Sequence, residues 1–262
     1  MGCSLGVLSL KGGVGKTSVV SALGDALSSF GKKVLLIDGN LSAPNLGLHL
    51  NVIDPEVTIH HVLMGNANAS KAIYKLENLD MMPASIVGRP VNPLKLRNKI
   101  RRLKNNYDLI LLDSPPSLND EALGVMLASD KLLVVTTPDY PTLRMSIKAI
   151  NLAKQRGVPI IGLVLNKVHK KNFELRIADI EEMANVPVMA VIPHDINVLK
   201  ALSEFVPSTK HKPKSDASIE YRKLAATLIG EKYKQTRLWD FFKRTPERHE
   251  INREIYYESI FG

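Results

Sequence analysis

The stretch that decides the fold is "KGGVGKTS", residues 11 to 18. It directly follows a short apolar run, and it precedes a segment with the hydrophobic periodicity of a helix. Three of its positions are glycines: Gly12, Gly13 and Gly15. Glycines let the backbone curl so that successive N–H groups, together with the N-terminus of the following helix, point at phosphate oxygens. The stretch therefore predicts a phosphate-binding loop between a first strand and a first helix.

The end of this loop, Gly15-Lys16-Thr17, matches the frame G-x-x-x-x-G-K-[ST], although the first glycine of the frame falls on Leu10. We expect Lys16 to neutralise the β and γ phosphates of a nucleotide and the Thr17 hydroxyl to bind Mg²⁺. An ordinary glycine-rich turn beside a lysine is the alternative, and the strand and helix around the loop argue against it. The residues predicted to bind the nucleotide here are Gly12, Gly13, Val14, Gly15, Lys16, Thr17 and Ser18.

Short runs rich in Val, Ile and Leu recur along the chain, at residues 5–10, 33–38, 108–113, 131–137, 160–166 and 186–192. Segments with helical periodicity separate them, at residues 18–30, 120–128, 141–156 and 172–184. Continuous apolar strands that alternate with helices indicate a parallel sheet covered on both faces. The predicted fold is therefore α/β, a doubly wound, mostly parallel sheet that binds ligands at the carboxyl ends of its strands.

Composition favours a soluble protein with one large domain. No apolar run in the 262 residues approaches the roughly 18 to 20 residues needed to span a bilayer. The single cysteine, Cys3, can form no internal disulfide, which suits a reducing cytoplasm. The net charge of +9 points toward anionic partners. We expect one domain over residues 1–230 and a tail over residues 231–262, where aromatic residues gather.

A lysine also begins the loop, at Lys11. The form K-G-G-x-G-K-[ST] resembles the deviant Walker A motif of the MinD/ParA family of ATPases. In that family this lysine reaches across a nucleotide-sandwich dimer to the phosphates of the partner subunit, in the manner of an arginine finger. The resemblance implies an ATP-dependent homodimer in which Lys16 acts within its own subunit and Lys11 acts on the partner. A solvated surface charge is the alternative for Lys11 taken alone.

The resemblance extends to about residue 230 and includes two acids. Asp38 begins the turn that corresponds to the first switch of the family, normally Asp-x-Asp, and Asp113 ends a buried strand as the Walker B aspartate does. An acid at the end of so apolar a strand must reach a cation or hydrogen-bond donors. The resemblance therefore implies a Mg²⁺ site at Thr17, Asp38 and Asp113, with "SPPSL", residues 114 to 118, as the second switch.

The second acid of the first switch is replaced by Asn40. In the family that acid lies near the γ-phosphate and helps position the attacking water. An amide can still orient water, but it cannot accept a proton at neutral pH. We therefore predict normal ATP binding with slow hydrolysis, unless an activating partner completes the site. Two alternatives remain: Asp38 or a second-switch residue substitutes for the acid, or the protein is a nearly non-hydrolysing, nucleotide-gated scaffold.

The choice of base is indicated by "LNKVH", residues 165 to 169. Guanine-specific members of the wider superfamily use Asn-Lys-x-Asp, whose carboxylate accepts from guanine, and here the fourth position is His169. This difference favours adenine, contacted by Asn166 and, by similarity to the family, by the segment around Pro193. The predicted cofactors are ATP and Mg²⁺.

Two segments predict the surface on which such a dimer acts. On a helical wheel, residues 233 to 244 place Leu238, Trp239, Phe241 and Phe242 within about 160°, with basic residues around the rest. This pattern is typical of an interfacial membrane anchor, and MinD proteins end in a comparable helix. We expect peripheral binding to an anionic membrane, on the inner face of the cell membrane. Packing on the protein itself or on a cargo protein is the alternative.

The tail continues beyond that segment with residues 247 to 262, which are net acidic. Ile251, Ile255 and Tyr256 could form a second amphipathic turn that covers the first or binds another protein. The alternative to a membrane is DNA, because residues 89 to 104 carry seven basic side chains and no acid. Nonspecific DNA binding needs little more than such a cluster, although a charge run can also be a solvated face.

Overall fold

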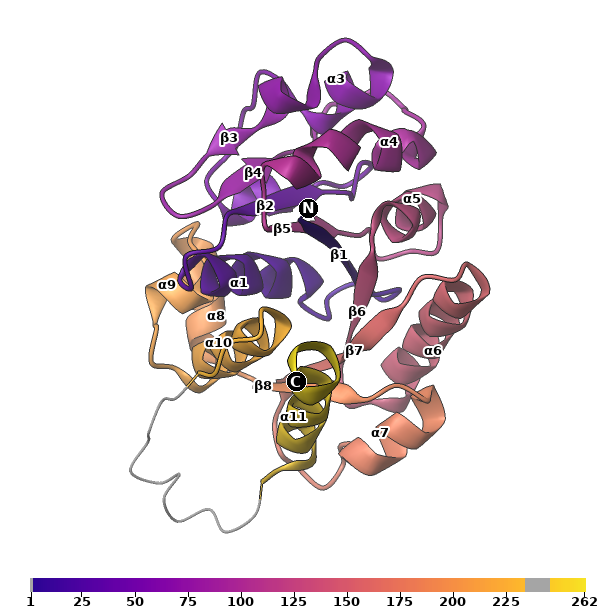
Figure 1. The fold of residues 1–262 in the computed structure, drawn as a ribbon, viewed down its shortest axis with the longest axis vertical. Coiled ribbons are helices and arrows are strands. Elements are labelled where there is room, and N and C mark those ends of the chain that lie inside the picture. Colours follow the sequence, from indigo (N-terminus) through magenta and orange to yellow (C-terminus); the bar gives the residue numbers. More distant parts are fainter. Residues whose placement is uncertain (1, 234–245) are drawn as a thin grey trace.

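A computed structural model describes residues 2–233 and 246–262, and an eight-stranded sheet forms its centre (Figure 1). The strand order is β3-β4-β2-β5-β1-β6-β7-β8, and every neighbouring pair is parallel except β3 with β4. The strands are β1 (Cys3–Leu8), β2 (Val34–Asp38), β3 (Tyr74–Lys75), β4 (Asp80–Met82), β5 (Leu109–Asp113), β6 (Lys131–Thr136), β7 (Ile160–Val168) and β8 (Val188–Pro193). The predicted doubly wound, mostly parallel α/β fold is confirmed.

Helices cover both faces of the sheet (Figure 1). They are α1 (Lys16–Ser28), α2 (Leu46–His49), α3 (Ile59–Met64), α4 (Leu96–Ile100), α5 (Asp120–Ala128), α6 (Tyr140–Gln155), α7 (Ile177–Ala184), α8 (Ile196–Ser203), α9 (Ser208–His211), α10 (Asp216–Leu228) and α11 (Arg248–Phe261). Three 3-10 turns complete the set: η1 (Ala69–Ala72), η2 (Pro93–Lys95) and η3 (Arg101–Asn105). None of the helices within these described ranges is long and apolar enough to cross a membrane.

Successive side chains of each strand point to opposite faces of the sheet, so two apolar cores form, one on each face. In β2, for example, Leu35 and Ile37 belong to one core, and Val34 and Leu36 belong to the other. The first core includes side chains of α3, α4, α5, α6 and α7, and the second includes side chains of α1, α2 and α10. Because both faces are buried, the strands show continuous apolar runs rather than strict alternation with polar residues.

The C-terminal helix α11 packs against the edge strand β8 and against α10. Its inward contacts are polar. The buried Arg253 guanidinium donates to the Met189 carbonyl at 3.1 Å and to the Glu220 carboxylate at 3.0 Å. The Asn252 amide donates to the Val188 carbonyl at 2.8 Å. Side chains of α11 therefore cover backbone carbonyls of the last strand of the sheet.

The apolar residues of α11 do not share one face. Tyr256 packs against the second core, whereas Ile251 and Ile255 are 45% and 60% exposed. The three residues therefore do not form one buried face, and binding of another protein by the exposed Ile251 and Ile255 stays a prediction. The predicted anchor at residues 233 to 244 lies, apart from Tyr233, outside the described residues.

Candidate functional site

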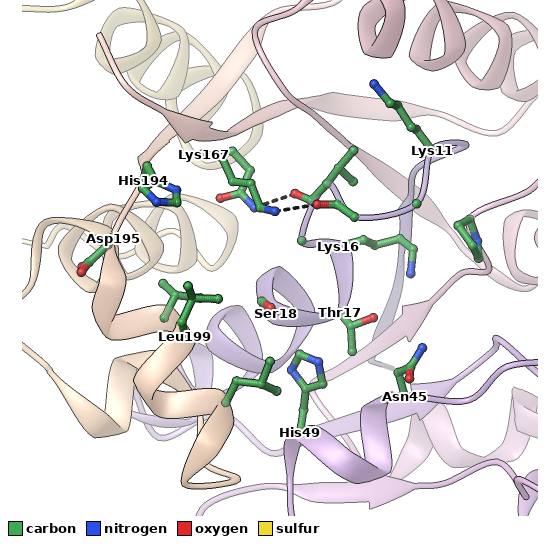
Figure 2. Close-up of a pocket in the computed structure, with 18 of the residues that line it drawn as sticks. Lys11, Lys16, Thr17, Ser18, Asn45, His49, Lys167, His194, Asp195 and Leu199 are labelled. Carbon is green, nitrogen blue, oxygen red and sulfur yellow. Dashed lines mark hydrogen bonds between the residues drawn. The ribbon is translucent and has the colours of Figure 1, made fainter.

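A cavity of about 370 Å³ opens at the carboxyl ends of the strands, where the loop of residues 11–18 joins β1 to α1 (Figure 2). The loop forms one wall. Residues that follow β2 and β5, and residues at the ends of β7 and β8, form the others, together with side chains of α2 and α8. Every loop residue predicted to bind a nucleotide lines this cavity, and so do Asn40, Asn166 and Pro193.

The loop has the backbone that its glycines predict. Gly13 and Gly15 have φ values of 78° and 86°, in the left-handed region that favours glycine. A Cβ atom on Gly15 would also lie only 2.4 Å from the side-chain nitrogen of Asn166. This side chain donates to the Val14 carbonyl at 2.7 Å, and the Lys167 ammonium donates to the Gly13 carbonyl at 2.7 Å (Figure 2). The end of β7 thus holds the loop in place.

Lys16, Thr17 and Asp113 come together beneath the loop. The Lys16 ammonium lies 2.5 Å from one carboxylate oxygen of Asp113, and the Thr17 hydroxyl donates to the other at 2.7 Å. Both charged side chains are buried. A hydroxyl and a carboxylate oxygen side by side are donors that Mg²⁺ accepts, so these residues fit a magnesium site. Among the described residues no cluster of three or more His, Cys, Asp or Glu could hold a metal ion, so water or phosphate oxygens would have to complete the coordination.

Asp38 is fully buried beside this group. Its carboxylate accepts hydrogen bonds from the backbone N–H groups of Asn40 at 3.1 Å, Asn45 at 3.1 Å and Leu46 at 3.0 Å. In the pairing of β2 with β5, Asp38 is the register partner of Asp113. Burial and the nearby Asp113 carboxylate raise the pKa of Asp38 to about 7. The two acids therefore compete for the single positive charge of Lys16.

Asn40 lies at the wall of the cavity and is itself buried. Its side-chain nitrogen donates to the Ala43 carbonyl, which fixes the turn after β2. The Glu121 carboxylate holds the same turn by accepting from the backbone N–H groups of Leu41 at 3.0 Å and Ser42 at 3.3 Å. The amide of Asn40 is thus part of the turn, and this structural role could not be read from the sequence.

Lys11 points away from Lys16 (Figure 2). Its ammonium donates to the Thr142 hydroxyl at 2.8 Å and lies 3.6 Å from the Asp139 carboxylate, at the N-terminus of α6. Burial would raise the pKa of Asp139, but hydrogen bonds from Thr137 and Thr142 and the charge of Lys11 outweigh it and lower that pKa. The two lysines of the loop therefore have separate environments, one buried and one half-exposed at the surface.

The opposite end of the cavity is largely apolar. It is formed by Pro193, by His194, whose ring stacks on His169 with centroids 4.6 Å apart, and by a row of side chains on α8. Those α8 side chains are Val198, Leu199 and Leu202. Sequence reasoning found Pro193 and missed α8, although "INVLKALS" has helical periodicity. It also missed His49, for which the sequence offers no signal, and it assigned no role to Lys167, although that lysine is the second position of the Asn-Lys-x-Asp frame.

Comparisons with known proteins agree with this geometry. A family model described as an AAA domain matches residues 4–157, and a second of the same description matches residues 117–201. The septum site-determining protein MinD of Bacillus subtilis is 30% identical over 246 residues, and the match covers 88% of this chain and 90% of that protein. The chain belongs to the MinD/ParA family of P-loop ATPases.

Two solved members of the family have the same fold. The cell division ATPase MinD of Pyrococcus furiosus is 36% identical, with a TM-score of 0.82, and the match covers 87% of this chain and 99% of that chain. The MinD protein of Pyrococcus horikoshii, complexed with Mg-ADP, is 34% identical, also with a TM-score of 0.82. That match covers 87% of this chain and 96% of the other. The phosphate loop thus belongs to a family fold that spans most of the chain.

Proposed function

We propose that this protein binds ATP with Mg²⁺, forms a face-to-face dimer on it, and uses the dimer to position itself or a cargo in the cell. The observation that carries the proposal is the phosphate loop with two lysines in separate environments. Lys16 is buried against Asp113, and Lys11 is at the surface beside Asp139. A lysine already within the site and a second one turned outward are what a cis and a trans role require. The Mg-ADP complex of the Pyrococcus horikoshii relative supports the choice of nucleotide.

The residues of the cavity divide between the parts of the nucleotide. The backbone N–H groups of residues 12–18 bind the phosphates, and Lys16 exchanges part of its contact with Asp113 for phosphate oxygens. Thr17, with Asp38 and Asp113 beneath the loop, would hold Mg²⁺, which would neutralise charge on the transferred phosphoryl group. Asn166 and Pro193 lie near the adenine, with the apolar wall of α8 beneath it.

Hydrolysis is slow in this proposal, because Asn40 supplies no proton acceptor. Its amide is also engaged with the Ala43 carbonyl, so it is not free to follow the nucleophile. An activating protein that completes the site would then control how long the dimer lasts. The protein acts in the cytoplasm and attaches peripherally to the inner face of the membrane through residues 233 to 244, whose basic and aromatic sequence supports this placement.

The cis and trans roles are tested by two substitutions. Lys16→Ala should abolish ATP binding, whereas Lys11→Ala should leave ATP binding within about threefold of wild type and abolish the ATP-dependent dimer. Isothermal titration measures binding, and light scattering after size exclusion measures dimers. A dimer of unchanged stability in the Lys11 variant would contradict the trans role.

Membrane attachment is tested by sedimentation with anionic liposomes, with ATP and with ADP. Phe242→Glu should remove ATP-dependent sedimentation and leave ATP binding intact. Ile255→Glu is the matched control, because it places the same charge on an exposed apolar position of α11, and it should sediment like wild type. Equal losses in both variants would show that residues 233 to 244 are not a specific anchor.

Nonspecific DNA binding is the second candidate, and one observation favours it. Of the seven basic residues between positions 89 and 104, only Lys104 has an acidic partner in the described parts of the chain, Asp130 at 2.7 Å. The other six are Arg89, Lys95, Arg97, Lys99, Arg101 and Arg102. Arg97 and Arg101 line a hollow beside the C-terminal end of α5, together with Lys104 and its partner Asp130.

Anisotropy of a labelled DNA duplex between 50 and 200 mM salt tests this candidate. If the surface binds DNA, Arg97→Gln with Arg101→Gln should weaken binding and reduce the slope of log affinity against log salt by about 2. Lys212→Gln with Lys214→Gln removes the same charge elsewhere and should leave that slope nearly unchanged. If wild type shifts DNA and ignores liposomes, the membrane proposal is wrong.

A further inference from the structure

His49 lies in the cavity, yet neither the loop motif nor the two acids account for it. It is the last residue of α2, and its ring lines the cavity on the same side as Thr17 and Ser18 (Figure 2). Within residues 2–233 and 246–262 no protein group forms a hydrogen bond with either ring nitrogen. A half-buried imidazole that faces a cavity without a protein partner is free to bind what fills the cavity.

The position of His49 is intermediate between the two ends of the cavity. The loop and Lys16 form the phosphate end, and Pro193 with Leu199 forms the apolar end suited to a base. In Figure 2 the His49 ring lies between Asn45, toward the phosphate end, and Leu199, toward the base end. A nucleotide that spans both ends places its sugar between them. We propose that His49 hydrogen-bonds a ribose hydroxyl of the bound nucleotide and so selects ribonucleotides over deoxyribonucleotides.

The chemistry of the ring favours a hydroxyl over a phosphate. Burial lowers the pKa of His49, the nearby Lys16 charge acts in the same direction, and Asp113 opposes them. The imidazole is therefore neutral at pH 7, with one nitrogen as a donor and the other as an acceptor. A sugar hydroxyl both donates and accepts, so it can use either nitrogen. A phosphate only accepts, and it already has the N–H groups of the loop.

The contact between His49 and the ribose also links the nucleotide to the turn after β2. The backbone N–H groups of Asn45 and Leu46, at the start of α2, donate to the buried carboxylate of Asp38. A nucleotide held by His49 at the end of α2 therefore touches the same short element whose beginning is fixed to Asp38. The contact of His49 with the ribose and the Asp38 carboxylate are thus connected through the single turn of α2.

The test is calorimetric titration of the Mg²⁺ complexes of ATP, 2′-deoxy-ATP and 3′-deoxy-ATP into wild type, His49→Leu and His49→Gln. Wild type should bind ATP about 3- to 10-fold more tightly than the analogue that lacks the contacted hydroxyl, the range expected for one hydrogen bond. His49→Leu should bind ATP and that analogue equally, and His49→Gln should recover part of the preference. His194→Leu is the matched control, because it makes the same change at the base end and should leave the preference unchanged.

The role of His49 rests on the proposed ATP binding, and the outcomes of the titration distinguish failure of one from failure of the other. If wild type binds ATP and the preference is absent, or persists in His49→Leu, the role of His49 is wrong and ATP binding stands. If wild type binds no ATP, the proposed function fails and the inference fails with it. Circular dichroism melting curves identify any variant that does not fold, and His49→Gln then decides the question.

Discussion

Asp38 and Asp113 are register partners on neighbouring strands, and in the described parts of the chain Lys16 is the one lysine that forms an ion pair with either of them. The lysine contacts Asp113, which leaves Asp38 to carry the cost of burial. Without a bound cation the site is electrostatically unfavourable, because two buried carboxylates repel each other. The residues of the loop are therefore arranged for a ligand that brings positive charge with it.

This arrangement predicts how stability depends on pH without nucleotide. The pKa of Asp38 is raised to about 7, from about 4 in an unfolded chain. Between these values the folded protein keeps a proton that the unfolded chain releases, so the contribution of Asp38 to the unfolding free energy falls as pH rises from about 4 to about 7 and is constant above. Urea unfolding at pH 5, 6, 7 and 8 should show a steeper fall for wild type than for Asp38→Asn. Parallel profiles would contradict the raised pKa.

Asn40 leads to a prediction about hydrolysis. Asn40→Asp introduces a proton acceptor where the proposed function places the γ-phosphate, and a general base typically contributes about 10²- to 10⁴-fold. The new carboxylate loses the donor to Ala43 and repels Asp38, so we expect a gain at the low end, about 10²-fold in phosphate release, with a lower unfolding temperature. Asn40→Ser, which restores no acid, should show no gain. Brisk turnover by wild type without improvement in Asn40→Asp would show that Asn40 does not limit hydrolysis.

Asp139 leads to a third prediction, about the dimer. It caps α6 by accepting from the Thr142 N–H at 2.9 Å, and it lies 3.6 Å from the Lys11 ammonium. Asp139→Asn keeps a capping oxygen and removes the charge that holds Lys11 in its own subunit. The ATP-dependent dimer should tighten, by at most about fivefold, because a half-exposed ion pair is worth less than about 1 kcal/mol. Sedimentation velocity measures the change, and a weaker dimer would indicate that Asp139 itself contributes to the interface.

At the residue scale, the loop and the two acids could be located from the sequence because these positions need particular chemistry. A buried acid at a strand end is costly without a cation or donors, and a glycine loop before a helix presents N–H groups suited to an anion. His49 could not be found in this way. It reaches the cavity through tertiary packing, and neither its residue type nor its spacing distinguishes it from surface residues. Lys167 stands in the Asn-Lys-x-Asp frame, but the frame does not show that its ammonium donates to the phosphate loop.

At the scale of elements, α11 is held largely by charged and polar contacts, in addition to the packing of Tyr256 against the second core. Burial would raise the pKa of Glu220, but hydrogen bonding from His249 and the charges of Arg253 and Lys223 outweigh it and hold that pKa well below its ordinary value. The Glu181 carboxylate adds a second anchor, accepting from Arg248 and from Asn252. Two carboxylates of the domain thus fix the helix.

The fourth prediction follows from this network. Arg253→Met leaves Glu220 buried without its closest guanidinium and leaves the Met189 carbonyl unpaired, which should lower the unfolding free energy by about 2 to 4 kcal/mol. Limited proteolysis should then cut between α10 and α11 faster than in wild type. Lys232→Met is the control, because its pair with Glu254 is exposed and should change stability by less than about 1 kcal/mol. Similar losses of unfolding free energy in Arg253→Met and Lys232→Met would mean that Arg253 contributes no more to stability than an exposed ion pair does.

The central strands were predicted to within two residues at each end because each is a continuous apolar run. Strands β3 and β4 were missed, since "YK" and "DMM" are too short to show any period, and their pairing depends on neighbours. The helix predicted from residue 172 begins at Ile177, because Arg176 is extended and the Leu175 N–H donates to the Pro138 carbonyl across the fold. Tertiary hydrogen bonds of this kind override local periodicity.

At the scale of the whole molecule, α11 protects an edge of the sheet. Strand β8 is the last in the order, and its Val188 and Met189 carbonyls are satisfied by side chains of α11. An uncovered edge strand is a template for pairing with other chains. The boundary predicted near residue 230 therefore stays a prediction, and removal of everything beyond it would also remove this cover.

The fifth prediction separates the two parts of the tail. A chain that ends at Lys232 should melt at lower temperature and lose solubility, because the edge of β8, Glu220 and Glu181 lose their partners. Replacing residues 234–245 with a glycine-serine linker of equal length, with α11 retained, should keep melting within about 2 °C of wild type. Differential scanning calorimetry and the soluble fraction after centrifugation measure both. A truncated chain as stable as wild type would show that α11 adds nothing to the fold.

The docking of α11 also limits how far the segment before it can travel. Tyr233 packs edge-on against Phe30, and Glu247, one residue after Pro246, lies 3.9 Å from Lys170 in its ion pair, so described residues on either side of 234–245 contact the domain. Residues 234–245 are thus tethered at both ends. Fully stretched, they span about 45 Å, so an outward and return path reaches about 20 Å from its anchors, whatever its conformation. A tail with one free end could swing the protein through many orientations on a bilayer. If residues 234–245 bind the membrane as proposed, attachment at both ends would keep the lipid close to Tyr233 and Glu247, so the geometry of attachment would be built into the chain itself.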